Sequence, residues 1–137
     1  MSAAEDIVIV GMARTPMGGL LGELANLSAP DLGAVAVKAA VKEAGVSGAD
    51  AIFMGNVLSA GLGQAPARQA ALKAGLDEGT QAVTLNKMCG SGLQAVAMAR
   101  QALLAGESDV VIAGGTESMT RAPFLMAKHR AGQKYGH

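Results

Sequence analysis

Short apolar runs alternate along this chain with longer segments in which apolar residues recur at helical spacing. Each apolar run contains β-branched residues and is followed by a glycine or an asparagine, and both residues favour turns. Runs of this kind predict buried strands, at residues 7–10, 51–54, 82–85 and 109–113.

Three longer segments predict helices. Ser28 is suited to cap the first helix, Asp31 suits the positive end of its dipole, and Gly45 provides a stop. The second helix is predicted over residues 64–74, and the third begins after Cys89. The apolar residues that share one face of this third helix are Leu93, Val96, Ala97, Leu103 and Leu104.

The order of these elements predicts the fold class. Three strand–helix pairs followed by a fourth strand indicate an α/β fold with a mostly parallel sheet. Binding sites in such sheets gather at the carboxyl ends of the strands. Cys89 follows the end of the third predicted strand, so it is expected at that edge of the sheet.

Composition narrows the picture further. The 137 residues suffice for one domain, and 11 basic residues balance 11 acidic ones, which gives no indication of nucleic acid or an anionic membrane as partner. No apolar run approaches the ~20 residues that span a bilayer, and the N-terminus lacks the basic start of a secretory signal. A single cysteine excludes an intrachain disulfide and fits a reducing compartment, so a cytoplasmic location is expected.

Cys89 is the strongest candidate for chemistry. It stands at a strand-to-helix turn, where free backbone N–H groups and the helix dipole favour a thiolate and an oxyanion. Gly90 and Gly92 lack a Cβ, so an acyl group can approach the backbone closely. The alternative is that Cys89 is a small buried hydrophobe at a tight turn.

Other candidates have less specific signals. Gly61 and Gly63 suggest a dinucleotide-binding loop, but Pro66 occupies the position of the third glycine, so this interpretation is disfavoured. Arg14 is a phosphate ligand or, more in keeping with its setting, an arginine that holds a neighbouring loop or subunit. Glu117 is an acid/base group or, preferably, a structural acceptor of hydrogen bonds beneath the site.

The two histidines, His129 and His137, are each a candidate base for Cys89, but both lie in a basic tail where a solvated loop histidine is the favoured interpretation. Met88 and Met119 are weak candidates for the lining of an acyl pocket. No metal ligand set is expected.

Four stretches resemble one known family. Residues 86–93 read Asn-Lys-Met-Cys-Gly-Ser-Gly-Leu and resemble the nucleophile motif of the thiolases, the acyl-CoA acetyltransferases. Three further stretches resemble the same family in the same order, at residues 13–18, 61–69 and 113–119. The form Cys-Gly-Ser-Gly-Leu is more similar to the branch that makes acetoacetyl-CoA than to the long-chain degradative branch.

The resemblance implies a three-layer α/β/α half-domain whose parallel-rich sheet has four of the usual five strands. Residues 1–118 would form this half-domain, and residues 119–137 would begin an insertion that covers the active site and helps to hold coenzyme A. The fifth strand, which follows that insertion, lies inside the sheet and runs antiparallel. We therefore expect the chain alone to be marginally folded, to pair its strands unusually, or to be completed by a partner chain.

The resemblance also implies an activity. Cys89 would take an acetyl group from acetyl-CoA, and the carbanion of a second acetyl-CoA would attack the resulting thioester to give acetoacetyl-CoA, or the reverse. Coenzyme A thioesters are then substrates, and no covalently bound cofactor is implied. The family's activating histidine and second cysteine have no matching positions here, so the isolated chain is predicted to be inactive. The alternative is a catalytically silent binding or assembly module.

The segment with Gln64, Arg68 and Gln69 matches the family's dimer interface, which implies assembly into a homo-oligomer.

Overall fold

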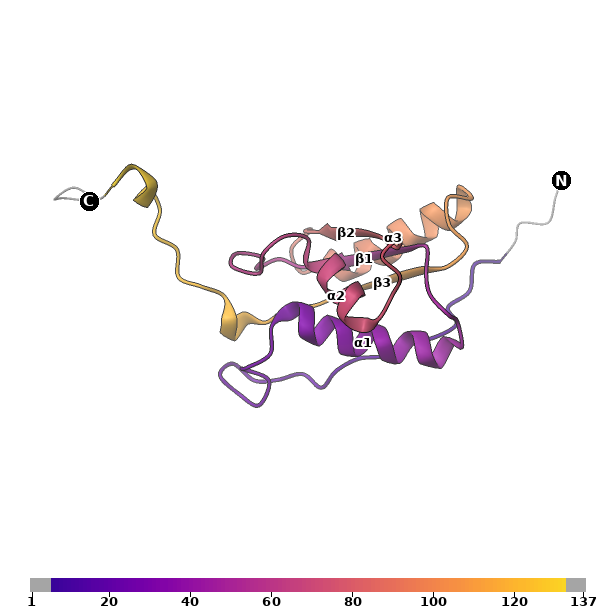
Figure 1. Ribbon diagram of the computed structural model, residues 1–137, viewed down its shortest axis with the longest axis horizontal. Coiled ribbons are helices and arrows are strands. Elements are labelled where there is room, and N and C mark those ends of the chain that lie inside the picture. The colour runs from indigo at the N-terminus through magenta and orange to yellow at the C-terminus, as the bar shows by residue number, and fades with distance from the viewer. Residues whose placement is uncertain (1–5, 133–137) are drawn as a thin grey trace.

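The computed structural model describes residues 6–132 as a small α/β unit with a long C-terminal tail (Figure 1). The helices and strands, in chain order, are α1 (Ala29–Ala44), β1 (Ala51–Gly55), α2 (Pro66–Ala74), β2 (Gln81–Leu85), α3 (Ser91–Leu104) and β3 (Val111–Gly115). Two short 3-10 helices follow, η1 (Met119–Arg121) and η2 (His129–Ala131). The three strands form a parallel sheet in the order β2-β1-β3.

Helices α1 and α2 cover one face of the sheet. Alternate residues of a strand point to opposite faces, and Ile52 and Met54 of β1 point toward these two helices. The register places Ile52 between Ala82 and Ile112 on the same face. The core on this side consists of Val37, Ile52, Met54, Ala67, Ala71 and Leu76. Its side chains are mostly small or aliphatic, as the composition of the chain requires.

Helix α3 covers the opposite face, which makes three layers, α/β/α (Figure 1). Its buried residues are all small, namely Ser91, Ala95, Ala99 and Ala102. A Cβ added at Gly55 would lie 2.6 Å from the Cβ of Ser91, so the helix start touches the backbone of β1. The apolar face noted in the sequence is therefore not the buried one: Leu93 is 78% exposed, and Val96 and Leu104 are also exposed.

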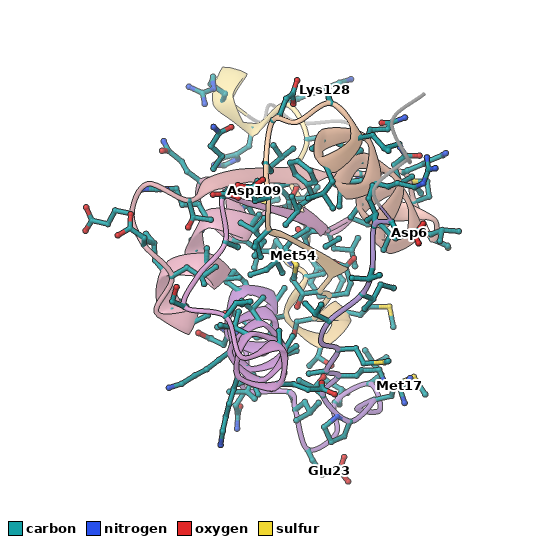
Figure 2. All side chains as sticks on the ribbon, turned by 90° about the vertical axis from the view of Figure 1, so that its right-hand side faces the viewer. Asp6, Met17, Glu23, Met54, Asp109 and Lys128 are labelled. Carbon is teal, nitrogen blue, oxygen red and sulfur yellow. The ribbon has the colours of Figure 1, made fainter. Side chains whose placement is uncertain are left out.

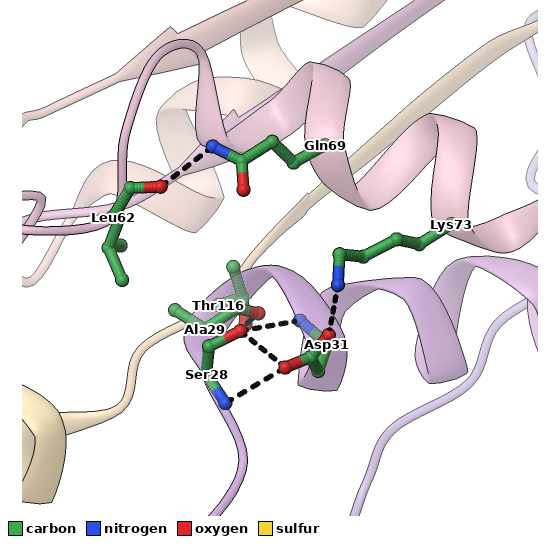
Figure 3. Close-up of polar contacts among 7 residues, drawn as sticks. All are labelled: Ser28, Ala29, Asp31, Leu62, Gln69, Lys73 and Thr116. Carbon is green, nitrogen blue, oxygen red and sulfur yellow. Dashed lines mark hydrogen bonds and ion pairs between the residues drawn. The ribbon is translucent and has the colours of Figure 1, made fainter.

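The first helix begins as its sequence predicts. Ser28 Oγ accepts a hydrogen bond from the Asp31 backbone N–H, and the Asp31 carboxylate accepts one from the Ser28 N–H at 3.2 Å (Figure 3). Lys73 of α2 forms an ion pair with Asp31 at 2.5 Å. The hydrogen bond from Lys73, followed by that from Ser28, lowers the pKa of Asp31 from 3.8 to about 2.

The prediction of a strand at residues 7–10 is wrong. This segment has no strand pairing, and Ile9 is 79% exposed. Figure 2 shows that the chain after Asp6 runs outside the three-stranded sheet. It contacts α1 instead, since the Met12 N–H donates to the Glu43 carboxylate at 2.9 Å. A strand needs a neighbour with which to exchange hydrogen bonds, and β3 pairs only with β1, so the described residues hold three strands rather than four.

The other predicted elements are confirmed with small shifts. The second helix starts at Pro66, two residues later than predicted, and the last strand covers 111–115 instead of 109–113. None of the helices within residues 6–132 is long and apolar enough to cross a membrane. After β3 the chain leaves the three layers as an extended tail (Figure 1). The boundary placed between residues 118 and 119 stays a prediction.

Candidate active site

The carboxyl ends of the three strands meet at one edge of the sheet and are joined there by backbone hydrogen bonds. The Asn56 N–H, just after β1, donates to the Leu85 carbonyl of β2 at 3.0 Å, and the Thr116 N–H, just after β3, donates to the Gly55 carbonyl at 2.9 Å. Cys89 follows β2 by four residues and precedes α3 by two. The structure therefore confirms the predicted location of Cys89 next to this edge.

Cys89 is exposed in a tight turn at the start of α3. The alternative of a small buried hydrophobe is therefore wrong. The N-cap residue of α3 is Gly90, which offers no side chain to the free N–H groups of the first turn. Within residues 6–132, the N–H groups of Cys89 and Leu93 donate to no acceptor. The thiol thus stands beside backbone donors that remain open.

The turn is shaped by a residue that sequence reasoning missed. Ser91 Oγ accepts a hydrogen bond from the Lys87 N–H at 2.8 Å and donates one to the Met88 carbonyl at 2.6 Å. Ser91 is only 5% exposed. The signal was present, because a serine between two glycines at the first helical position is suited to bond the preceding turn.

Glu117 joins the ends of β3 and β1. Its carboxylate accepts hydrogen bonds from Asn56 Nδ2 at 2.9 Å, from the Val57 N–H at 2.9 Å and from the Leu58 N–H at 3.0 Å. These three bonds confirm the structural interpretation of Glu117. Asn56 itself is 2% exposed, and its Oδ1 has no hydrogen-bond partner in the described part of the chain.

Arg68 and Gln69 hold loops of this same chain, and Gln64 lies in one of these loops. Gln69 Nε2 donates to the Leu62 and Gln64 carbonyls, both at 2.7 Å, and Figure 3 draws the first of these contacts. Arg68 donates to the Thr80 carbonyl at 3.3 Å and to the Glu78 carbonyl at 2.9 Å. These contacts are all intramolecular, so the assembly role of the three residues stays a prediction.

The backbone conformation of Gly61 and Gly63 is typical of a loop. Both have positive φ, 76° and 80°, which glycine adopts without strain. The two glycines lie in the connection between β1 and α2 rather than in a turn that leads directly from strand to helix. This geometry agrees with the interpretation that the stretch is not a dinucleotide-binding loop.

Arg14 lines a cavity of about 160 Å³ near the carboxyl edge of the sheet. The other lining residues belong to the segment before α1, to α1 itself and to the end of β3, namely Ala13, Thr15, Leu32, Gly33, Ala36, Gly115, Thr116 and Glu117. Both interpretations of Arg14, phosphate ligand and support of a neighbouring segment, stay open.

The remaining candidates lie apart from the thiol or are solvated. His129 is exposed in η2, which Figure 1 shows at the far end of the tail, away from the sheet. This agrees with a solvated loop histidine. His137 lies outside the described residues. Met88 and Met119 are both exposed, and no contact tests their role in an acyl pocket.

Together, the fold and the exposed Cys89 define an α/β half-domain that presents a thiol at the carboxyl edge of a parallel sheet. The chain belongs to the thiolase family: residues 7–137 match the family described as thiolase, N-terminal domain.

Individual relatives agree with this assignment. The chain is 52% identical over 134 residues to acetyl-CoA acetyltransferase 2 of Arabidopsis thaliana, a match that covers 96% of this chain and 33% of the relative. It is 54% identical over 131 residues to a probable acetyl-CoA acetyltransferase of Mycobacterium leprae, with 94% and 33% covered. The chain thus spans about a third of the length of the curated relatives it matches.

A solved structure matches the fold. The crystal structure of a thiolase from Ascaris suum in complex with coenzyme A superposes with a TM-score of 0.86 and 41% sequence identity. The match covers 88% of this chain and 32% of the Ascaris protein. It confirms the predicted thiolase-like α/β half-domain.

Proposed function

We propose that this chain is the N-terminal part of an acetyl-CoA C-acetyltransferase in which Cys89 carries the acyl group. The Cys89 thiolate attacks the carbonyl carbon of acetyl-CoA, a carbon–sulfur bond forms, and the bond to coenzyme A breaks. Coenzyme A leaves as a thiolate and takes up a proton. A second acetyl-CoA loses an α-proton, and its carbanion attacks the acetyl-cysteine to give acetoacetyl-CoA and the free thiol.

The observation that carries this proposal is the exposed thiol at an uncapped helix start. An oxyanion develops on the acyl oxygen during the attack, and N–H donors aimed at it lower the barrier. The open N–H group of Cys89 is positioned to contribute such a donor. The names of the relatives support acetyl-CoA as the substrate, and the coenzyme A bound to the Ascaris thiolase supports a coenzyme A thioester.

The same proposal requires residues from outside this sequence. Cys89 is the single cysteine of the chain, and the described histidine, His129, is in the tail. A base for the thiol and a group that removes the α-proton must therefore come from another part of a longer protein or from a partner chain. We propose that such a part also pairs with β3, since within residues 6–132 this strand pairs with β1 alone and the apolar segment 7–10 stands exposed.

Labelled acetyl-CoA tests the first step directly. Together with a chain that supplies the missing base, the 137-residue chain should gain one acetyl group on Cys89, detected by mass spectrometry of the digested protein, and a Cys89→Ser variant should gain none. Formation of acetoacetyl-CoA is expected only after addition of a chain that carries the missing histidine and cysteine. Absence of any label on Cys89, with or without that added chain, would refute the proposed acyl carrier.

A second candidate function is an assembly module without catalysis. The contacts of Arg68 and Gln69 support this function because they fix the surface before and within α2, and a rigid surface is suited to pack against a second copy. We propose that this surface, with Gln64, contributes to a homo-oligomer. Sedimentation of the purified chain compared with an Arg68→Ala variant tests this. A wild-type chain that is monomeric at high concentration would exclude it for the chain on its own.

A further inference from the structure

We propose that Ser91 is the positioning residue of Cys89: its hydroxyl fixes the turn that presents the thiol, without contacting the substrate. This inference rests on the proposed function, in which Cys89 accepts the acyl group. The hydrogen bonds and the backbone conformation of residues 86–92 support this role of Ser91.

The hydroxyl of Ser91 bonds the turn at two points, the Lys87 N–H before Met88 and the Met88 carbonyl, which belongs to the peptide that joins Met88 to Cys89. It accepts from the Lys87 N–H at 2.8 Å and donates to the Met88 carbonyl at 2.6 Å. At 5% exposure, the hydroxyl group makes these bonds with little competition from water. Two bonds from one rigid short side chain leave the backbone on either side of Met88 little freedom to move.

The backbone conformation of Met88 shows why these two hydrogen bonds are needed. Its φ is +50°, in the left-handed region that a bulky residue seldom adopts because its Cβ then crowds the following carbonyl oxygen. Asn86 Oδ1 accepts a hydrogen bond from the Met88 N–H at 3.0 Å, so side chains before and after the turn hold the same strained residue. If Met88 relaxed to negative φ, the direction of the chain into Cys89 would change, and the thiol would leave its place beside the helix start.

The position of Ser91 is itself fixed by the sheet. An added Cβ on Gly55 would lie 2.6 Å from Ser91 Cβ and 2.9 Å from the Gly92 nitrogen, so Ser91 sits directly on the end of β1. An added Cβ on Gly115 would lie 3.6 Å from Gly92 Cα, so the end of β3 lies close as well. Through Ser91 and Gly92, the Cys89 turn therefore takes its position from the ends of two strands.

The test is the alkylation rate of Cys89 by iodoacetamide in the native 137-residue chain. The Ser91→Ala variant should react about tenfold more slowly, because removing the hydroxyl lets the turn leave the presenting conformation. Ser118→Ala is the matched control, since the Ser118 hydroxyl also donates one hydrogen bond, to the Leu27 carbonyl at 2.8 Å, but lies away from this turn. The control should alkylate at the wild-type rate. Equal rates in Ser91→Ala and wild type would overturn the proposal.

Second-site rescue separates positioning from a general loss of stability. Glycine adopts positive φ without strain, so Met88→Gly in the Ser91→Ala background should restore part of the lost rate. A hydroxyl that mattered only for packing on Gly55 would show no such rescue, and that result would refute the proposal. Acetylation of wild-type Cys89 by labelled acetyl-CoA is scored separately. Wild-type acetylation with an unchanged Ser91→Ala alkylation rate refutes only the positioning role, and absent acetylation refutes only the proposed function.

Discussion

The two long helices of this molecule begin in opposite ways. At the start of α1, Ser28 and Asp31 bond each other's backbone N–H groups, and Lys73 pairs with the carboxylate (Figure 3). At the start of α3, Gly90 offers no side chain, and Cys89 stands exposed beside it. Both starts carry the same partial positive charge. In α1 the protein satisfies that charge itself, whereas in α3 it remains open for an external anion.

The faces of the sheet show the same contrast. The face under α1 and α2 holds the aliphatic core, with Ile52 fully buried. The opposite face carries Phe53, Val83 and Ala113, and α3 meets it with serine and alanine, while Leu93, Val96 and Leu104 of the helix are exposed. Small residues let the helix approach the strands closely, which places the Cys89 turn accurately but buries little apolar area. Stability and placement are thus supplied by different sides of the same sheet.

The largest expected effect contrasts the two faces. Ile52→Ala should lower the free energy of unfolding by ~2–5 kcal/mol, because it leaves a cavity in the packed face. Leu93→Ala, on the exposed side of α3, should change it by less than ~0.5 kcal/mol in the isolated chain. Urea unfolding followed by circular dichroism measures both. Similar losses in the two variants would mean that the outer face of α3 is covered in solution.

A smaller effect is expected where α3 meets β1. Gly55→Ala places a Cβ 2.8 Å from the backbone carbonyl carbon of Ser91, and the overpacking should cost ~1–3 kcal/mol. Gly48→Ala is the control, because a Cβ there meets no atom within 4 Å. The same denaturant titration reports both values. The contact is looser than the structure indicates if Gly55→Ala unfolds at the wild-type midpoint.

Removal of the α1 cap should have a moderate effect that stays on its own side of the molecule. Ser28→Ala loses the bond that Ser28 Oγ accepts from the Asp31 N–H and the one that its hydroxyl donates to the Asp31 carboxylate, and should cost ~1 kcal/mol of stability. The alkylation rate of Cys89 should stay unchanged, since the cap lies on the other side of the sheet. Ser47→Ala, in the exposed loop after α1, controls for loss of a hydroxyl. A slower Cys89 reaction in Ser28→Ala would show that the two helix starts are coupled.

The smallest effect is the pH dependence of the α1 cap. The pKa of Asp31 is lowered to about 2 from 3.8, so folding favours its charged form, and this stability is present above pH 3.8 and lost as the pH falls toward 2. The pair with Lys73 is partly exposed, so screening by water and salt keeps the contribution small. Melting temperatures of wild type and Asp31→Asn should therefore converge as the pH falls through this window. A constant difference across it would contradict the prediction.

Local signals were sufficient for most elements of the fold. The cap at Ser28, the stop at Gly45 and three of the four β-branched runs each depend on a few neighbouring residues, and the structure confirms them within two residues. The place of Cys89 at the sheet edge followed from chain order alone, because parallel strands put their carboxyl ends together. The resemblance to thiolases added the family, which the comparisons confirm.

The failures came from non-local effects. Residues 7–10 have the composition of a strand, but a strand forms only beside a partner strand, and no local pattern shows whether that partner is present. The sequence predicted the wrong buried face of α3: Ala95, Ala99 and Ala102 are the buried residues, and the helix start lies close against Gly55 through Ser91 and Gly92. The structure alone also showed what Glu117 and Ser91 bind, since their partners lie on other elements or depend on the shape of a turn.

The order of strands and helices, the single thiol and its position before a helix were determined by the sequence of this protein, because each depends on residues that are close in the chain. The strand order, the buried face of α3 and the hydrogen bonds of Ser91 around Met88 were decided only in three dimensions. Those features depend on which backbones approach each other. A glycine such as Gly55 permits a close approach, but the sequence does not show which residue will approach it.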